Sequence, residues 1–67
     1  MKRESNAFAS QAKIRVLIAD DHPVVRLGIK AGLKPQRDMT VVGEAGDGVE
    51  ALALAKEQLP DVVVAFM

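Results

Sequence analysis

Cysteine, tryptophan and tyrosine are absent from the 67-residue sequence, and phenylalanine occurs only twice. Without cysteine the chain has no disulfide, no thiolate metal ligand and no cysteine nucleophile, and we expect a protein of the reducing cytoplasm. Because aromatic rings are so few, the core must be packed from the aliphatic side chains that dominate the 49% hydrophobic content. This composition is typical of a small α/β protein.

A net charge and a long hydrophobic segment are also missing. Nine acidic and nine basic residues cancel and are interspersed along the chain, so there is no basic patch for nucleic acid or for an anionic membrane surface. The longest apolar run, residues 62–67, is far shorter than the roughly 20 residues that cross a bilayer. We therefore expect no direct binding to nucleic acid and no membrane span.

The length of the chain allows a single small domain. A chain of about 60 residues removes only about 60% of its unfolded surface from water when it folds, so we expect marginal stability. Residues 1–13 mix polar and small side chains without apolar periodicity. They are predicted to form a disordered N-terminal extension, and the ordered domain is expected at residues 14–67.

The apolar pattern predicts three short strands that alternate with two helices. The strands, which are rich in β-branched residues, are expected at residues 14–19, 39–45 and 61–66. Strands joined in this way pair in parallel through right-handed crossovers, with one helix on each face of the sheet. The predicted fold is therefore α/β, an incomplete doubly wound parallel sheet.

The first helix is expected at residues 23–33, where a proline fits the first turn and Asp21 or His22 can cap the free N–H groups. Its apolar side chains spread over about two-thirds of the helical circumference, which requires cover from two sides. Gly28 and Gly32 lie near the middle of this arc. We expect them to allow a close approach between the helix and the sheet.

The second helix is expected to begin after Asp47, with Glu50 completing a capping-box pattern, and to end at Leu59-Pro60. Residues 46–51 also match the relaxed dinucleotide pattern G-x-G-x-x-A, so a small nucleotide-binding βαβ unit is an alternative. However, Asp47 would place negative charge where a pyrophosphate approaches, and the acidic ribose ligand expected about 20 residues later would lie past the last residue. A turn followed by a helix cap is the favoured interpretation.

Asp20 and Asp21 are the first candidate site, because they follow a buried strand at the edge of the sheet where open α/β proteins bind ligands. Carboxylate oxygens suit Mg²⁺, which takes one or two protein carboxylates and completes its octahedron with water and phosphate. The spacing alone equally allows Asp21 to be a helix cap and Asp20 to be merely solvated. His22 is the only histidine and has no cysteine or second histidine with which to form a ligand set, so a structural role is favoured.

Three segments resemble response-regulator receiver domains, especially those joined to a helix-turn-helix DNA-binding output domain. The similar segments are residues 14–26, 41–51 and 59–64. The resemblance implies a flavodoxin-like receiver fold and a signalling module of a two-component phosphorelay, in a transcription regulator rather than an enzyme. In this family the paired acids hold Mg²⁺, and an aspartate at the end of the third strand takes a phosphoryl group from a histidine kinase.

At that acceptor position the sequence has Phe66, whose ring has no nucleophilic oxygen and no metal ligand. The resemblance therefore implies a receiver that is cut off within its third strand and cannot be phosphorylated. Only Asp20 and Asp21 are carried over as metal ligands, so Mg²⁺ binding is expected to be weak or vestigial. No other cofactor is implied.

The resemblance also implies a histidine kinase or a phosphotransfer protein as partner, docked near the start of the first helix. Arg26, Lys30 and Lys34 form the polar stripe of this helix, most simply a solvated face. A retained docking surface would make the chain a decoy for the kinase. A third alternative is a small interaction protein that self-associates through its unfinished sheet.

Overall fold

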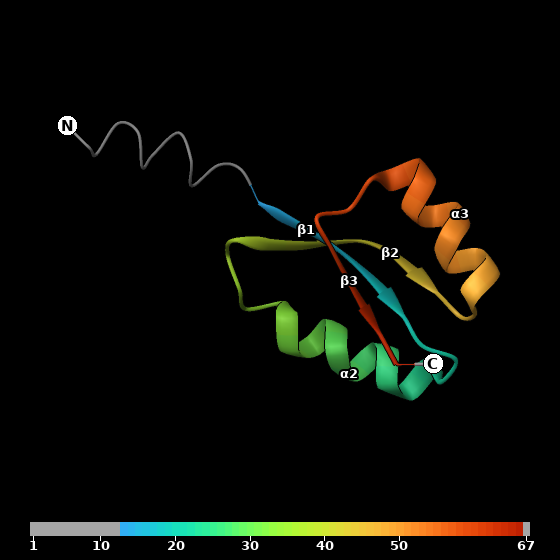
Figure 1. Ribbon diagram of the computed structural model, residues 1–67. Coiled ribbons are helices and arrows are strands. Elements are labelled where there is room, and N and C mark those ends of the chain that lie inside the picture. The colour runs from blue at the N-terminus through green and yellow to red at the C-terminus, as the bar shows by residue number, and fades with distance from the viewer. Residues whose placement is uncertain (1–12, 67) are drawn as a thin grey trace.

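The structure is a computed structural model that describes residues 13–66. It contains the five elements predicted from the sequence, in the order β1 (Ile14–Ala19), α2 (Pro23–Leu33), β2 (Met39–Ala45), α3 (Gly48–Gln58) and β3 (Val62–Ala65) (Figure 1). Only the third strand differs, since it is one residue shorter at each end than predicted. The predicted extension at residues 1–13 lies outside the described residues apart from Lys13.

The three strands form one parallel sheet in the order β2-β1-β3, which confirms the predicted α/β architecture. β1 lies in the centre, and its last four residues are buried together with Ala45 of β2. The pairing of β1 with β2 shifts between Val16 and Leu17, so that Leu17 lies opposite Gly43. A Cβ atom at Gly43 would lie 3.1 Å from the Leu17 side chain and 3.6 Å from Leu54. This glycine therefore lets α3 pack closely on the centre of the sheet.

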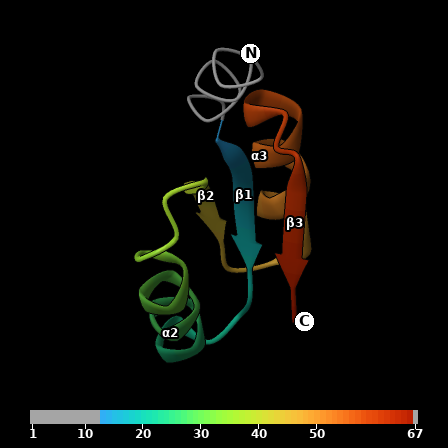
Figure 2. The same ribbon diagram turned by 90° about the vertical axis from the view of Figure 1, so that its left-hand side faces the viewer.

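The helices cover opposite faces of the sheet, as right-handed crossovers require (Figures 1 and 2). The predicted role of Gly28 and Gly32 is wrong, because a Cβ atom at either position would meet nothing within 4 Å. Instead α2 turns its basic side toward β2, where Arg26 and Lys30 pair with Glu44. Part of its apolar arc is consequently left open to solvent.

Side chains fix the start of α3, and a left-handed residue marks its end. At its start the Asp47 carboxylate accepts a 2.8 Å hydrogen bond from the Glu50 amide, and the Glu50 carboxylate accepts a 2.7 Å bond from the Gly46 amide. These two bonds confirm the predicted cap and occupy N–H groups that a pyrophosphate would need, which disfavours the dinucleotide alternative. At its end, Leu59 adopts a left-handed conformation with a φ of 48°.

The segment from the end of α3 to the start of β3 is bound to Arg15 near the start of β1. The Arg15 guanidinium donates hydrogen bonds to the carbonyls of Gln58 and Leu59. The Asp61 carboxylate accepts a 2.8 Å bond from the Arg15 amide, and the Asp61 amide donates a 2.8 Å bond to the Arg15 carbonyl. In residues 13–66 no helix is long and apolar enough to cross a membrane.

Candidate metal centre at the end of the first strand

The candidate site lies where the carboxyl ends of β1 and β3 meet. Ala19 pairs with Ala65, so the next residues along the two strands, Asp20 and Phe66, lie side by side. The Phe66 amide donates a 3.0 Å hydrogen bond to the Ala19 carbonyl. On the other side, the Asp20 amide donates a 3.0 Å bond to the Ala45 carbonyl of β2. Asp20 is thus held in the middle of the sheet edge.

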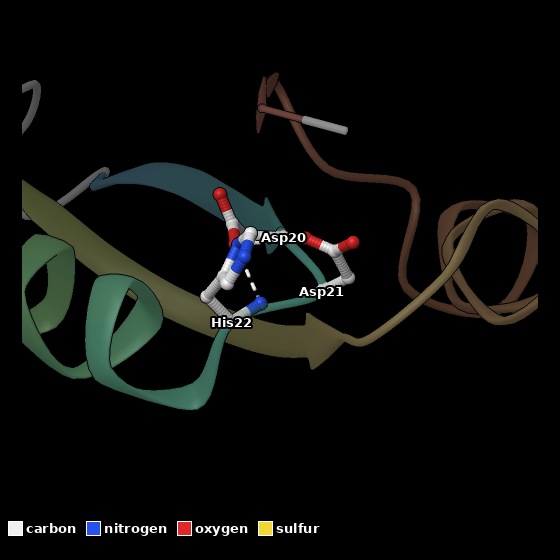
Figure 3. A group of neighbouring side chains, drawn as sticks. All are labelled: Asp20, Asp21 and His22. Carbon is white, nitrogen blue, oxygen red and sulfur yellow. Dashed lines mark hydrogen bonds and ion pairs between the residues drawn. The ribbon is translucent and has the colours of Figure 1, made fainter.

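Asp20 is buried, with only 2% of its surface exposed. Its Oδ1 atom accepts a 2.7 Å hydrogen bond from the His22 amide and lies 3.1 Å from His22 Nδ1 (Figure 3). Asp21 is exposed, and its Oδ1 atom lies 2.8 Å from the same ring nitrogen. One ligand atom from each of the three side chains falls within 4.8 Å of the others.

These contacts correct the predicted helix cap. His22 occupies the N-cap position of α2 by its backbone, but neither its side chain nor that of Asp21 caps an N–H group of the helix. The His22 ring is instead drawn to the two carboxylates, while 70% of the side chain stays exposed. The alternative in which Asp20 is merely solvated is also wrong, because a solvated side chain would not be buried.

The donor set fits a hard divalent cation. Two carboxylates are brought together, and within residues 13–66 neither has a lysine or arginine nitrogen within ion-pair distance. A buried carboxylate without a lysine or arginine partner is costly, and a bound cation would offset that cost. His22 adds a nitrogen that Mg²⁺ accepts less readily than oxygen. Asp20 and Asp21 are therefore the residues that would hold Mg²⁺.

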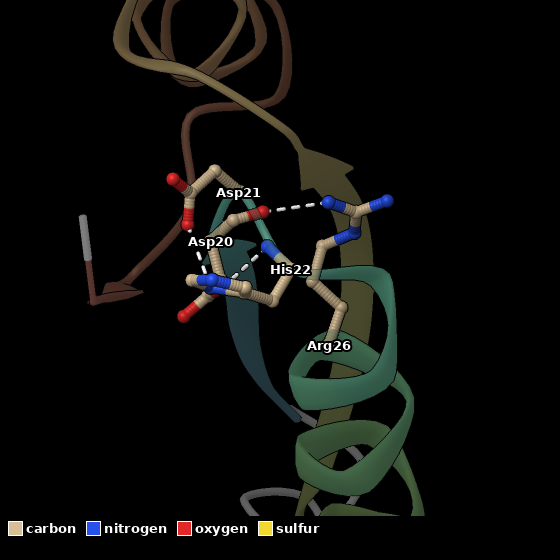
Figure 4. A network of polar contacts seen from close by, with 4 residues as sticks. All are labelled: Asp20, Asp21, His22 and Arg26. Atoms are coloured by element: carbon tan, nitrogen blue, oxygen red, sulfur yellow. Dashed lines mark hydrogen bonds and ion pairs between the residues drawn. The ribbon is translucent and has the colours of Figure 1, made fainter.

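A second polar network adjoins this site and was not predicted from the sequence. Arg26 Nη1 donates a 2.6 Å hydrogen bond to the backbone carbonyl of Asp20 (Figure 4). The Arg26 Nε atom lies 3.4 Å from Glu44 Oε1. Lys30 Nζ lies 2.7 Å from the other Glu44 oxygen. The hydrogen bond from Lys30 is the largest cause of the lowered pKa of Glu44. Burial opposes it, and the charge of Lys30 and the close polar contact and charge of Arg26 add to it.

This network shows that the basic stripe is only in part a solvated face. Arg26 and Lys30 are partly buried against β2, whereas Lys34 is exposed. A signal for the pairing was present in the sequence, since two basic residues one helical turn apart precede a strand that carries a lone glutamate. It does not specify which carboxylate they meet, because the partners are at least 14 residues apart.

Comparison with known proteins identifies the family. The protein-family model of the response regulator receiver domain matches residues 16–65 of the sequence. The chain therefore belongs to this family. It is 56% identical over 52 residues to the uncharacterized transcriptional regulatory protein YxjL of Bacillus subtilis and 53% identical over 51 residues to the transcriptional regulatory protein LiaR of the same organism. These alignments cover 78% and 76% of the chain but only 24% of each relative.

A solved structure agrees with the sequence comparison. The signal receiver domain of NarL from Mycobacterium tuberculosis superposes with a TM-score of 0.78 at 46% identity, over 81% of this chain and 44% of that one. The chain thus spans about a quarter of the curated relatives and somewhat less than half of a receiver domain. It corresponds to the N-terminal part of a receiver of the type found in two-component transcriptional regulators.

Proposed function

We propose that the chain is a receiver-type module that binds Mg²⁺ weakly and does not accept a phosphoryl group. The observation that carries this proposal is the position of Phe66, which follows β3 directly beside Asp20. That position is the one at which the resemblance to receivers implies the phosphate-accepting aspartate. A phenyl ring offers neither a nucleophile nor a metal ligand.

Asp20 and Asp21 would hold the cation, and the cation would supply positive charge for phosphoryl oxygens nearby. The two acids have different tasks, because Asp20 is fixed within the sheet edge and Asp21 projects into solvent. With Phe66 in place of a third carboxylate, water must fill most of the coordination sphere. Weak binding follows from that ligand set.

Neither acid of the pair is suited to replace the missing acceptor. The Oδ1 atom of Asp20 is engaged by the His22 amide and ring, and the whole side chain is shielded from an incoming phosphodonor. Asp21 is accessible, but it lies on the loop after β1 and not at the end of β3, where the resemblance to receivers implies the acceptor. Phosphorylation of either is therefore disfavoured.

A histidine kinase or a phosphotransfer protein is the proposed partner class, and a DNA-binding transcription regulator is the proposed parent protein. Exposed apolar side chains at the start of α2, Val24 at 79% and Leu27 at 62%, lie close to the acidic pair in sequence and support docking at this face. A chain that docks there without accepting phosphate would compete with functional receivers for the kinase.

The experiment that tests this proposal is incubation with acetyl phosphate and Mg²⁺ followed by intact-mass measurement. The chain is expected to gain no phosphoryl group. A receiver domain that retains its acceptor aspartate, treated in parallel, shows that the phosphodonor is active. An added phosphoryl group on any aspartate of this chain at substantial occupancy would overturn the proposal.

A further inference from the structure

The Arg26 guanidinium connects three separate parts of the structure. It extends from the first turn of α2, donates to the carbonyl of Asp20 in the loop after β1, and lies against Glu44 of β2. Figure 4 shows this carbonyl and the acidic side chains on the same short loop. Arg26 therefore contacts the metal-site loop without being a metal ligand itself.

The Asp20 carbonyl has no backbone donor within residues 13–66. At this edge of the sheet the backbone donors bind other carbonyls. The Phe66 amide donates to Ala19, the last residue of β1, and the Asp20 amide donates to Ala45, the last residue of β2. The donor to the carbonyl of the peptide group between Asp20 and Asp21 is thus the Arg26 side chain. Because that peptide precedes the Asp21 Cα atom, its orientation sets the direction in which the Asp21 carboxylate projects.

Arg26 is not the only basic residue that links α2 to β2. Lys30 already forms the shorter ion pair with Glu44, at 2.7 Å compared with 3.4 Å for Arg26. The Arg26 Nε atom is buried and lacks a hydrogen bond of good geometry, so its link to Glu44 is electrostatic. Arg26 is held near Glu44 by charge, while its Nη1 atom makes the one well-formed bond, to the Asp20 carbonyl.

We propose that Arg26, held by Glu44, is a positioning residue that orients the Asp20–Asp21 peptide so that both carboxylates face one divalent cation. This inference rests on the proposed metal site. The direction of the change in Mg²⁺ affinity when Arg26 is replaced distinguishes this role from a simple charge effect. Arg26 is positive, so removal of its charge should strengthen cation binding by Coulomb interaction alone, whereas loss of positioning weakens it.

The test compares Arg26→Gln with Lys30→Gln, a matched variant that removes the other partner of Glu44 without touching the loop. Mg²⁺ affinity is measured from amide shifts of residues 20–22 during titration. Outer-shell contacts of metal sites typically contribute 10-fold or more, so we expect Arg26→Gln to weaken binding by about tenfold and Lys30→Gln to change it by less than about twofold. Unchanged or tighter binding in Arg26→Gln overturns the inference.

Hydrogen exchange of the His22 amide in metal-free protein provides a second readout. This amide donates to the Asp20 carboxylate, so it reports the order of the loop. We expect faster exchange in Arg26→Gln and exchange like that of the unsubstituted chain in Lys30→Gln. If the unsubstituted chain gives no saturable Mg²⁺ response, the proposed metal site fails, and the exchange comparison alone decides the positioning role. Equal exchange in both variants overturns it.

Discussion

The backbone of Phe66 is hydrogen-bonded to that of Ala19, with 3.0 Å between the Phe66 nitrogen and the Ala19 oxygen. Through this bond the residue after β3 is aligned with Asp20, the residue after β1. A carboxylate at position 66 would therefore join Asp20 and Asp21 at one sheet edge. The phenyl ring, which is largely exposed, leaves that edge with two acids.

Phe66→Asp is expected to restore metal binding but not a switch. A third carboxylate about 4 Å from a divalent ion adds about 2 kcal/mol even in water, so Mg²⁺ affinity should rise by roughly tenfold or more. Slow phosphorylation by acetyl phosphate becomes feasible. Phosphate can shift a conformational equilibrium only by interacting differently with two states, so an added phosphoryl group alone is not expected to rearrange the elements.

The measurement is a comparison of amide spectra and oligomeric state of Phe66→Asp before and after treatment with phosphodonor and Mg²⁺. Changes confined to residues near the sheet edge are expected. A global change that depends on phosphorylation would show that these residues already contain a complete switch.

Asp21→Ala is expected to weaken Mg²⁺ binding by roughly tenfold or more, because an exposed carboxylate near a divalent ion contributes about 2 kcal/mol. Asp38→Ala serves as the control, since Asp38 is an exposed acid in the loop before β2. A Mg²⁺ titration monitored through amide chemical shifts distinguishes the two variants. Binding that survives the loss of both Asp20 and Asp21 would rule out the assigned site.

The pH dependence of stability should reflect Glu44. Its pKa is lowered from 4.5, chiefly by the Lys30 hydrogen bond, so the folded state binds this proton less readily than the unfolded state does. The resulting stability is fully present above pH 4.5 and is lost as pH falls through the lowered folded-state value. For a pair this exposed, the contribution is at most about 1 kcal/mol.

Urea unfolding of the unsubstituted chain and of Glu44→Gln at several pH values measures this contribution. The two stability curves should converge as pH falls below 4.5. A constant difference between them across the acidic range would mean that Glu44 does not titrate as the ion pairs require.

Self-association through β3 is expected, because within residues 13–66 this strand pairs only with β1. Its other edge is open, and Val62 and Val63 are exposed. Sedimentation velocity over a concentration series should show association that Val63→Lys reduces. Val49→Lys, an equally large change at an exposed position of α3, is the control and should leave association unaltered.

The order of the elements was predictable because it depends on local signals. β-branched runs defined the strands, and Asp47 with Glu50 defined the start of α3. The rotation of α2 was not predictable in the same way. A helical wheel gives the width of the apolar arc, but the Glu44 pairs determine which part of the arc faces the sheet, and they join residues distant in sequence.

The candidate site was predictable in its residue types but not in its contacts. Two acids after a buried strand indicated the location, and the structure places them there. Asp21 and His22 were predicted to cap α2 from their position in the sequence just before the helix, without regard to the neighbouring strands. The buried Asp20 carboxylate competes for the same side chain and backbone amide of His22, and that competition becomes visible only when the sheet edge is assembled.

The paired bonds between Arg15 and Asp61 have a consequence at the opposite end of the sheet. A slip of β3 by one residue would turn each of its side chains to the other face, and a four-residue strand has few ladder bonds with which to resist such a slip. The two reciprocal bonds at Asp61 set the alignment at the first residue pair. The residue that lies beside Asp20 is therefore determined at the far end of β3. Asp61→Ala should allow β3 to populate more than one register, so that residues other than Phe66 also occupy this position.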